Sequence, residues 1–233
     1  MSDQTVSCYS SRLLIDYATA NGVDVQMAIP YINTPYPDLI NNNKWMSAFD
    51  WVKLATFVSQ SVNKTVEQVG YEIVMSTACN STFRFMMLRM FPIYLMQKMR
   101  LTNKLFSNHI NKNQYAVLDN LTGSSVVFRL FIKDKALHAR EFCDYNRGAA
   151  KALLELRGHI GVLIEDIACV STEVACDWCV YRMSWTGCNK ERGAAKARET
   201  GAKLKSAKVG PDLKACILSE KEIAVLFDKV ERS

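Results

Sequence analysis

Half of the eight cysteines in this 233-residue chain lie in one stretch, between His138 and Trp185. They are Cys143, Cys169, Cys176 and Cys179, and an acidic pair, Glu165 and Asp166, precedes the second of them. Thiolates gathered with a carboxylate can close a tetrahedral zinc site, which would bring the segments that carry them together. Only Cys176 and Cys179 have the CxxC spacing of a zinc finger. The stretch therefore indicates a metal site without choosing its ligands.

The N-terminus bears on how these cysteines are interpreted. It has no basic region followed by an apolar run, as a signal peptide would. We therefore expect a cytoplasmic protein, in which clustered cysteines bind metal or act in redox chemistry more often than they form disulfides. A thioredoxin-like role would need Cys176 at a helix N-terminus, whereas we predict a strand after it. Buried free cysteines that only pack are the alternative.

Apolar patterning predicts a helical N-terminal half and a mixed C-terminal half. Helices are expected at residues 10–22, 23–29, 47–58 and 64–77, with a loop rich in proline and asparagine at 30–44. Strands at 114–119 and 124–132 would form one hairpin, and strands at 162–169 and 179–185 a second. A helix at 138–157 would lie between the hairpins and end at Gly158. This order predicts an α+β fold, with a helical N-terminal half packed on a small antiparallel sheet.

A methionine-rich segment separates the two halves. Six of the ten methionines lie between Met75 and Met99, with aromatic residues among them. Thioethers and flat rings either fill a core or line an apolar cavity that accepts a guest. The candidate pocket residues are Met75, Met86, Met87, Met90, Phe91 and Tyr94. Three cations, Arg84, Arg89 and Lys98, interrupt the segment, so we expect no membrane span.

The composition changes after residue 187. Residues 190–208 hold seven Lys and Arg against two acids, which is typical of a solvated linker or a weak basic helix. A capping box at 219–222 then precedes an apolar stripe, which predicts an amphipathic helix. We therefore divide the chain into a domain at 1–187 and a basic linker with a C-terminal helix at 188–233. A net charge of +6, without interleaved aromatics or a reading helix, does not favour nucleic-acid binding.

Two motifs carry a resemblance to a known family. The first is the run CDYNRG, which contains Asp144, Tyr145, Asn146, Arg147 and Gly148, and the second is C-x-Y-x-x-x-W from Cys179 to Trp185. Over roughly residues 8–186 the chain resembles the ligand-sensing domains that precede bacterial sensor kinases and nucleotide cyclases. Their fold group includes vinyl reductase-type, phenol-sensor-type and haem nitric-oxide-binding domains. A purely architectural role for the first motif is the alternative, because Asn and Arg can bond neighbouring backbone and Gly allows close packing.

The resemblance implies a structural zinc and a set of ligands for it. In the phenol-sensor branch one cysteine precedes an acid-x-x-Cys step by 23 residues, and here 166 − 143 = 23. The ligands implied are Cys143, Asp166, Cys169 and Cys179. Glu165 and Cys176 are the alternates, because the family has Glu at the acidic position and a shorter spacing to its last cysteine. The zinc-pinned C-terminal hairpin would then be tied to the preceding helix.

The haem-binding members of the group ligate iron with a histidine and hold the propionates with a Tyr-x-Ser-x-Arg run. This chain has three histidines, and its nearest similar run, Tyr9 to Arg12, has a different spacing. We therefore do not expect haem, and we keep His109 as the single candidate ligand for it. The sequence contains no Gly-rich phosphate loop, Gly-x-Ser-x-Gly or His-Glu-x-x-His motif, so we do not expect an enzyme.

The combined prediction is a non-enzymatic sensor domain of bacterial type that binds a small hydrophobic or aromatic molecule. The resemblance implies a homodimer, and the C-terminal helix would transmit binding to a signalling partner or output module. One alternative is a protein-interaction adaptor of the same fold that takes no ligand. Another is a protein or enzyme that binds haem or a related tetrapyrrole, as the vinyl reductase type suggests.

Overall fold

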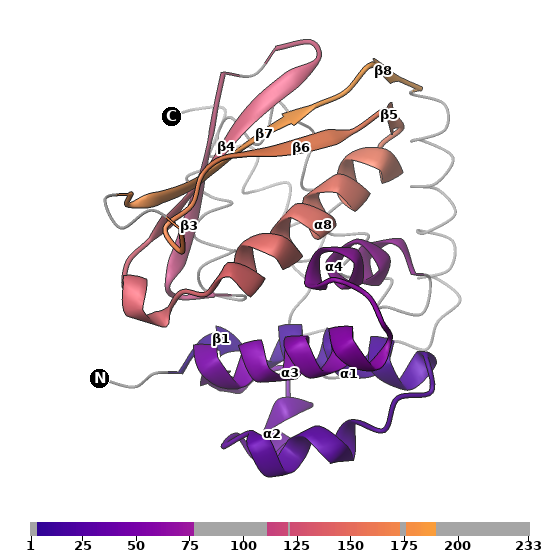
Figure 1. Ribbon diagram of the computed structural model, residues 1–233, viewed down its shortest axis with the longest axis vertical. Coiled ribbons are helices and arrows are strands. Elements are labelled where there is room, and N and C mark those ends of the chain that lie inside the picture. Colours follow the sequence, from indigo (N-terminus) through magenta and orange to yellow (C-terminus); the bar gives the residue numbers. More distant parts are fainter. Residues whose placement is uncertain (1–3, 77–110, 121, 173–175, 190–233) are drawn as a thin grey trace, which may run out of the picture.

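The computed structural model describes residues 4–76, 111–120, 122–172 and 176–189. Helix α8 (Arg140–Leu156) lies between a four-stranded sheet and helix α4 (Val66–Met75), and the other N-terminal helices lie beyond α4 (Figure 1). Helix α8 therefore contacts both halves of the described chain.

The N-terminal half is built from short helices with polar caps. Its elements are β1 (Gln4–Ser7), α1 (Cys8–Ala20), the 3-10 helix η1 (Val25–Tyr31), α2 (Tyr36–Leu39), β2 (Trp45–Ser47), α3 (Ala48–Ser61) and α4. The Ser7 side chain accepts from the Tyr9 backbone N–H, so α1 begins two residues before the predicted start. Thr65 and Gln68 form a capping box on α4.

An apolar core joins these helices to α8. Leu14 on α1 and Leu54 on α3 are fully buried in it. Trp51 of α3 stacks on Phe142 of α8 with ring centroids 4.5 Å apart. The first turn of α8 is thereby fixed against the N-terminal half, and the same turn carries Cys143.

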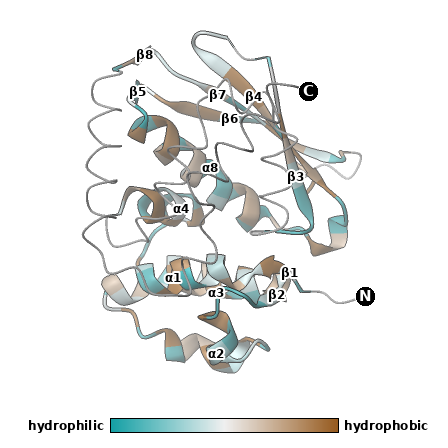
Figure 2. Ribbon diagram, turned by 180° about the vertical axis from the view of Figure 1, so that it is seen from behind, coloured by the Kyte–Doolittle hydropathy of each residue, from teal (hydrophilic) through white to brown (hydrophobic). Residues whose placement is uncertain are grey.

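The sheet is antiparallel, with strand order β3-β4-β7-β6. Its strands are β3 (Gln114–Asp119), β4 (Ser125–Ile132), β6 (Leu163–Ala168) and β7 (Trp178–Ser184), while β5 (His159–Ile160) and β8 (Gly187–Cys188) form a separate small pair. Leu130 pairs with Cys179 and Phe128 with Tyr181, and the β6–β7 register shifts between Asp166 and Ala168. Brown, apolar stretches of these strands lie next to α8 in Figure 2.

Helices α4 and α8 cross at two glycines. A Cβ added to Gly148 of α8 would collide with the carbonyl oxygen of Glu67, and one added to Gly70 of α4 would collide with that of Tyr145. The Tyr71 hydroxyl also donates to a Glu155 carboxylate oxygen at 2.6 Å. Close backbone approach at this crossing explains why α8 needs a glycine within the CDYNRG run.

The predicted α+β class, with helices packed on a small antiparallel sheet, is confirmed. None of the described helices is both long enough and apolar enough to cross a bilayer. Met75 is half-buried at the end of α4. The other predicted pocket residues, Met86, Met87, Met90, Phe91 and Tyr94, lie outside the described residues, as do His109 and nearly all of the predicted C-terminal segment.

Candidate metal centre

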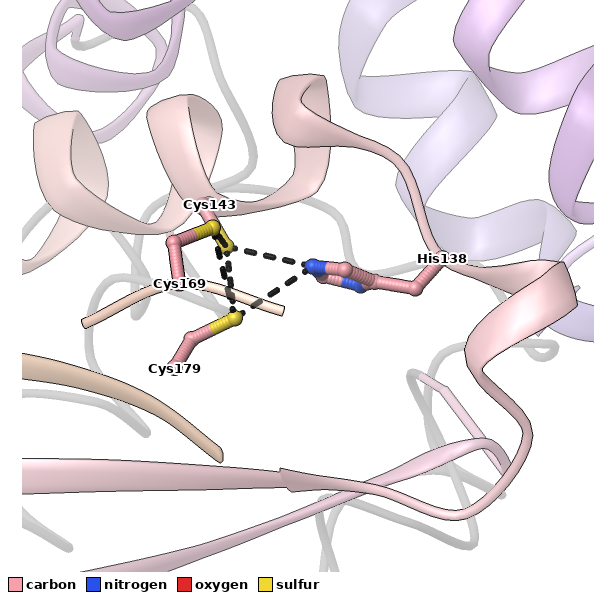
Figure 3. Close-up of side chains that lie close together, drawn as sticks. All are labelled: His138, Cys143, Cys169 and Cys179. Carbon is pink, nitrogen blue, oxygen red and sulfur yellow. Dashed lines mark hydrogen bonds between the residues drawn. The ribbon is translucent and has the colours of Figure 1, made fainter. Parts of the chain in front are cut away.

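Four side chains from separate parts of the C-terminal half converge on one point (Figure 3). They are His138, Cys143, Cys169 and Cys179, called here the His/Cys cluster, and their donor atoms all lie within 4.8 Å of one another. The three cysteines are at most 2% exposed, and His138 is half-buried. A buried group of one imidazole and three thiols is a common donor set for zinc.

The secondary structure explains this convergence. His138 follows the short 3-10 helix η2 (Lys135–Leu137), and Cys143 lies in the first turn of α8. Cys169 comes directly after β6, and Cys179 is the second residue of the neighbouring strand β7. Because α8 packs on the sheet near the end of β6 and the beginning of β7, all four side chains meet at one corner.

The distances within the cluster match a small tetrahedral ion. The Cys143 and Cys179 sulfurs lie 3.2 Å apart, and the Cys169 sulfur lies 3.7 Å from each of them. The His138 Nε2 atom lies 3.3 Å from the Cys143 sulfur and 3.4 Å from that of Cys179. Zinc–sulfur bonds of about 2.3 Å at tetrahedral angles place two sulfurs about 3.8 Å apart. Only a small outward movement would be needed to hold the ion.

A buried side chain orients the histidine. The His138 Nδ1 atom lies 3.4 Å from the side-chain nitrogen of Gln114, which is 2% exposed. When Nε2 ligates a metal, Nδ1 carries the proton, and the Gln114 amide oxygen can accept it if the amide is turned over. The imidazole also stacks on Phe142, with centroids 6.0 Å apart. Nε2 is therefore the ring nitrogen available to the three sulfurs.

The three thiols differ in acidity. Hydrogen bonding to Cys169 and Cys179, together with burial, raises the pKa of Cys143 far above its usual value. The hydrogen bond from Cys143 lowers the pKa of Cys169 and also that of Cys179. These shifts come from the close contact of the three sulfurs, and a cation at the centre would stabilise all three as thiolates.

The structure places Asp166, the predicted acidic ligand, elsewhere. Its carboxylate forms ion pairs with Arg140 and Arg147, and Arg147 also binds Glu67 and Asp144. Burial would raise the pKa of Asp166, but the hydrogen bonds from the two arginines outweigh it and lower that pKa. These five residues are called here the ion-pair network. Their arginines already neutralise the Asp166 carboxylate.

The two alternate ligands also lie outside the cluster. Glu165 is exposed, and its register partner on β7 is Arg182. The Cys176 thiol donates to the Trp178 carbonyl oxygen at 2.7 Å. His138 is not among the ligands predicted from the sequence. The available signal was its position at the start of the predicted helix, five residues before Cys143.

The family-motif residues hold the architecture around the cluster. Asp144 accepts hydrogen bonds from Arg140 and Arg147, and the Tyr145 ring meets Trp51 edge-on at 5.3 Å. Gly148 lies at the crossing with α4, and Asn146 is half-buried on the same turn of α8. Trp185 donates to the Gly123 carbonyl oxygen at 3.0 Å and packs on His159.

Comparison with solved structures places this fold among known ones. No protein-family profile and no curated protein matches the chain. A Tt H-NOX double mutant superposes with a TM-score of 0.57 at 9% identity, covering 78% of this chain and 96% of that one. An H-NOX protein from S. oneidensis in the Fe(II)NO ligation state has a TM-score of 0.55 at 13% identity, covering 80% and 100%. At these identities the likeness shows a shared H-NOX fold.

These neighbours correct two expectations. They do not confirm the vinyl reductase or phenol-sensor naming, because they belong to the haem nitric-oxide-binding branch of the fold group. They also contradict the expectation that haem is not bound. A further neighbour, with a TM-score of 0.54 at 11% identity, comes from work on heme distortion in the H-NOX family.

Two of the chain's three histidines, His138 and His159, lie among the described residues. Of the histidines, His138 is directed at three sulfurs and His159 packs on Trp185. The expectation against haem relied on the small number of histidines and on the run from Tyr9 to Arg12, whose spacing differs from Tyr-x-Ser-x-Arg. The third histidine, His109, lies outside the described ranges.

Proposed function

We propose that this chain is a non-enzymatic ligand-sensing domain with an H-NOX fold. The observation that carries the proposal is the fold match, which spans about four fifths of this chain and the whole of the S. oneidensis domain. Ligand binding would change the packing of the helical half on the sheet, and a signalling partner or second subunit would respond. Residues 188–233 are the proposed connection to that partner, and a homodimer remains part of the proposal.

The proposed ligand is a hydrophobic, largely planar molecule held by the segment between α4 and β3. Support comes from the six methionines and several aromatic rings in and beside this segment, which suit an apolar guest. Haem is the first ligand to test, because the solved neighbours belong to the H-NOX family. If haem binds, iron supplies the site for a diatomic gas, and His109 is the proposed axial ligand.

We also propose that the His/Cys cluster holds one structural zinc ion. Three thiolates and an imidazole provide four donors, which leaves no open position for a catalytic water. The three cysteines are also buried, so water has little access to a metal held there, and this too supports a structural role. A zinc ion there would tie α8 to strands β6 and β7, on the opposite side of α8 from the N-terminal core.

Two measurements on freshly purified full-length protein test these proposals. Elemental mass spectrometry is expected to find about one zinc per chain. An absorption spectrum after reconstitution with hemin is expected to show a Soret band that His109→Ala weakens or shifts, with His159→Ala as the matched control. No Soret band, no change on adding small aromatic compounds and no co-purifying ligand would refute the sensor and favour the adaptor. Absence of zinc would refute the metal site alone.

A further inference from the structure

A tyrosine lies next to the His/Cys cluster with its polar group unused. Tyr181 is two residues after Cys179 on β7, so both side chains point to the face of the sheet that α8 covers. Its side chain is 2% exposed, and the ring stacks on Phe128 with centroids 5.4 Å apart and planes 12° apart. Packing fixes the ring and leaves the hydroxyl no route to solvent.

The Tyr181 hydroxyl has no hydrogen-bond partner among the described residues. The Cys143 and Cys179 side chains belong to the same buried cluster as Tyr181. A buried hydroxyl without an acceptor destabilises the fold. The groups beside it are thiols, which accept hydrogen bonds weakly while protonated and much more strongly as thiolates.

Metal binding would change the acceptor beside this hydroxyl. In the metal-free protein the Cys143 thiol donates its proton to the Cys179 sulfur at 3.2 Å. A divalent ion displaces that proton to solvent, and the freed sulfur lone pair becomes the ligand bond. Three thiolates around a divalent ion leave one net negative charge (2 − 3 = −1) in a buried place, where an O–H donor stabilises it.

We propose that Tyr181 is a positioning residue for the metal, whose hydroxyl donates a hydrogen bond to the Cys143 thiolate in the metal-bound protein. This inference rests on the proposed metal site and adds to it a residue that hydrogen bonds to one of the ligands. Partners of this kind commonly change metal affinity about 10–100-fold when they are removed. The hydroxyl thus favours the metal-bound state and contributes nothing to the metal-free state.

The test is Tyr181→Phe, which keeps the ring and its stacking and removes only the hydroxyl. Zinc affinity, measured by competition with a chelator, is expected to fall about 10–100-fold. Unfolding of the metal-free variant by urea is expected at the same or a higher midpoint, because an unpaired buried hydroxyl has been removed. With cobalt in place of zinc, the thiolate charge-transfer band is expected at longer wavelength, because the sulfur loses a hydrogen bond.

The matched control is Tyr115→Phe. Tyr115 pairs with Phe131 on the opposite face of the sheet and packs on Trp178. Tyr115→Phe should change neither the zinc affinity nor the absorption spectrum of the cobalt-bound protein. Wild-type affinity and spectrum in Tyr181→Phe would overturn this inference and leave the metal site standing. A metal-free Tyr181→Phe protein that is clearly less stable would also overturn it, because the hydroxyl would then act in packing. Wild-type protein that binds neither zinc nor cobalt would overturn the metal site, and this inference with it.

Discussion

Two polar clusters lie side by side on α8, and they satisfy their charges in different ways. The ion-pair network sets two arginines against three carboxylates, with Arg147 at 13% side-chain exposure and in contact with all three. The His/Cys cluster contains a half-buried imidazole and three buried thiols that hydrogen bond to one another. The first cluster carries its own counter-charges. The second brings four donor atoms within 4.8 Å of one another, which a cation could bind, and we propose it as the metal site.

Loss of the metal should have the largest effect. Cys169→Ser removes a ligand, so zinc content should fall from about one per chain to near zero. At free zinc about a thousandfold above Kd, the metal adds about 4 kcal/mol to the free energy of unfolding, and the variant loses that amount. Elemental analysis and urea unfolding check this. Cys188→Ser, at an exposed cysteine outside the cluster, is the control. Full zinc content in Cys169→Ser would contradict the assignment.

A substitution at the α4–α8 crossing tests whether the ion-pair network and the His/Cys cluster are independent of each other. In Gly148→Ala the new Cβ meets the Glu67 carbonyl and the Tyr71 backbone, so the helices must move apart and the Arg147–Glu67 ion pair is lost. The expected loss of stability is about 3 kcal/mol, with zinc content unchanged. Gly123→Ala is the control, because its Cβ would meet nothing. Loss of zinc in Gly148→Ala would show that the clusters are not independent.

Asp166→Asn tests the assignment of the acid directly. Removing the carboxylate leaves two arginines with fewer partners, at a cost of about 2 kcal/mol after discounting for partial exposure. Zinc affinity should stay at the wild-type value, which chelator competition measures. Glu165→Gln, at an exposed position, should change neither quantity. A large fall in zinc affinity in Asp166→Asn would restore the carboxylate as a ligand.

The pH dependence of Asp166 gives the smallest effect. Because its folded pKa is lowered, the carboxylate stabilises the fold above its unfolded pKa of about 3.9, and this contribution is lost as the pH falls through the folded pKa. The stability difference between wild type and Asp166→Asn should therefore be constant from pH 7 to about 5 and shrink in stronger acid. Urea unfolding of both proteins without metal measures it. A difference that grows as the pH falls would contradict the lowered pKa.

Local signals predicted much of the fold. Alternation located β3, β4, β6 and β7, and apolar periodicity with caps located α1, η1, α3 and α4, whereas the short helix α2 lies in the predicted loop at 30–44. Helix ends were less certain, because the Ser7 cap on α1 competes with Ser10 and Ser11. The arrangement of the strands, with β7 between β4 and β6, depends on pairings distant in sequence.

Only part of the candidate site was predictable, again because some of its contacts join residues distant in sequence. The resemblance implied Cys143, Cys169 and Cys179 as ligands, and the structure brings them together. The fourth member could not be chosen in that way. Asp166 is drawn to two arginines on α8 whose spacing from it, 26 and 19 residues, carries no periodic signal. His138 lies beside Cys143 in sequence, but its direction depends on η2 and on Gln114. Metal binding itself remains a prediction.

The position of the His/Cys cluster along the chain also bears on the order of folding. All four side chains fall between residues 138 and 179, a separation of 41 (179 − 138 = 41), and none comes from the N-terminal helices. Closing a loop of this length costs less conformational entropy than joining the two ends of the chain. We therefore expect α8 and the β6–β7 hairpin to form first when zinc is present. The N-terminal helices would then condense on the completed face of α8 through Phe142 and Gly148.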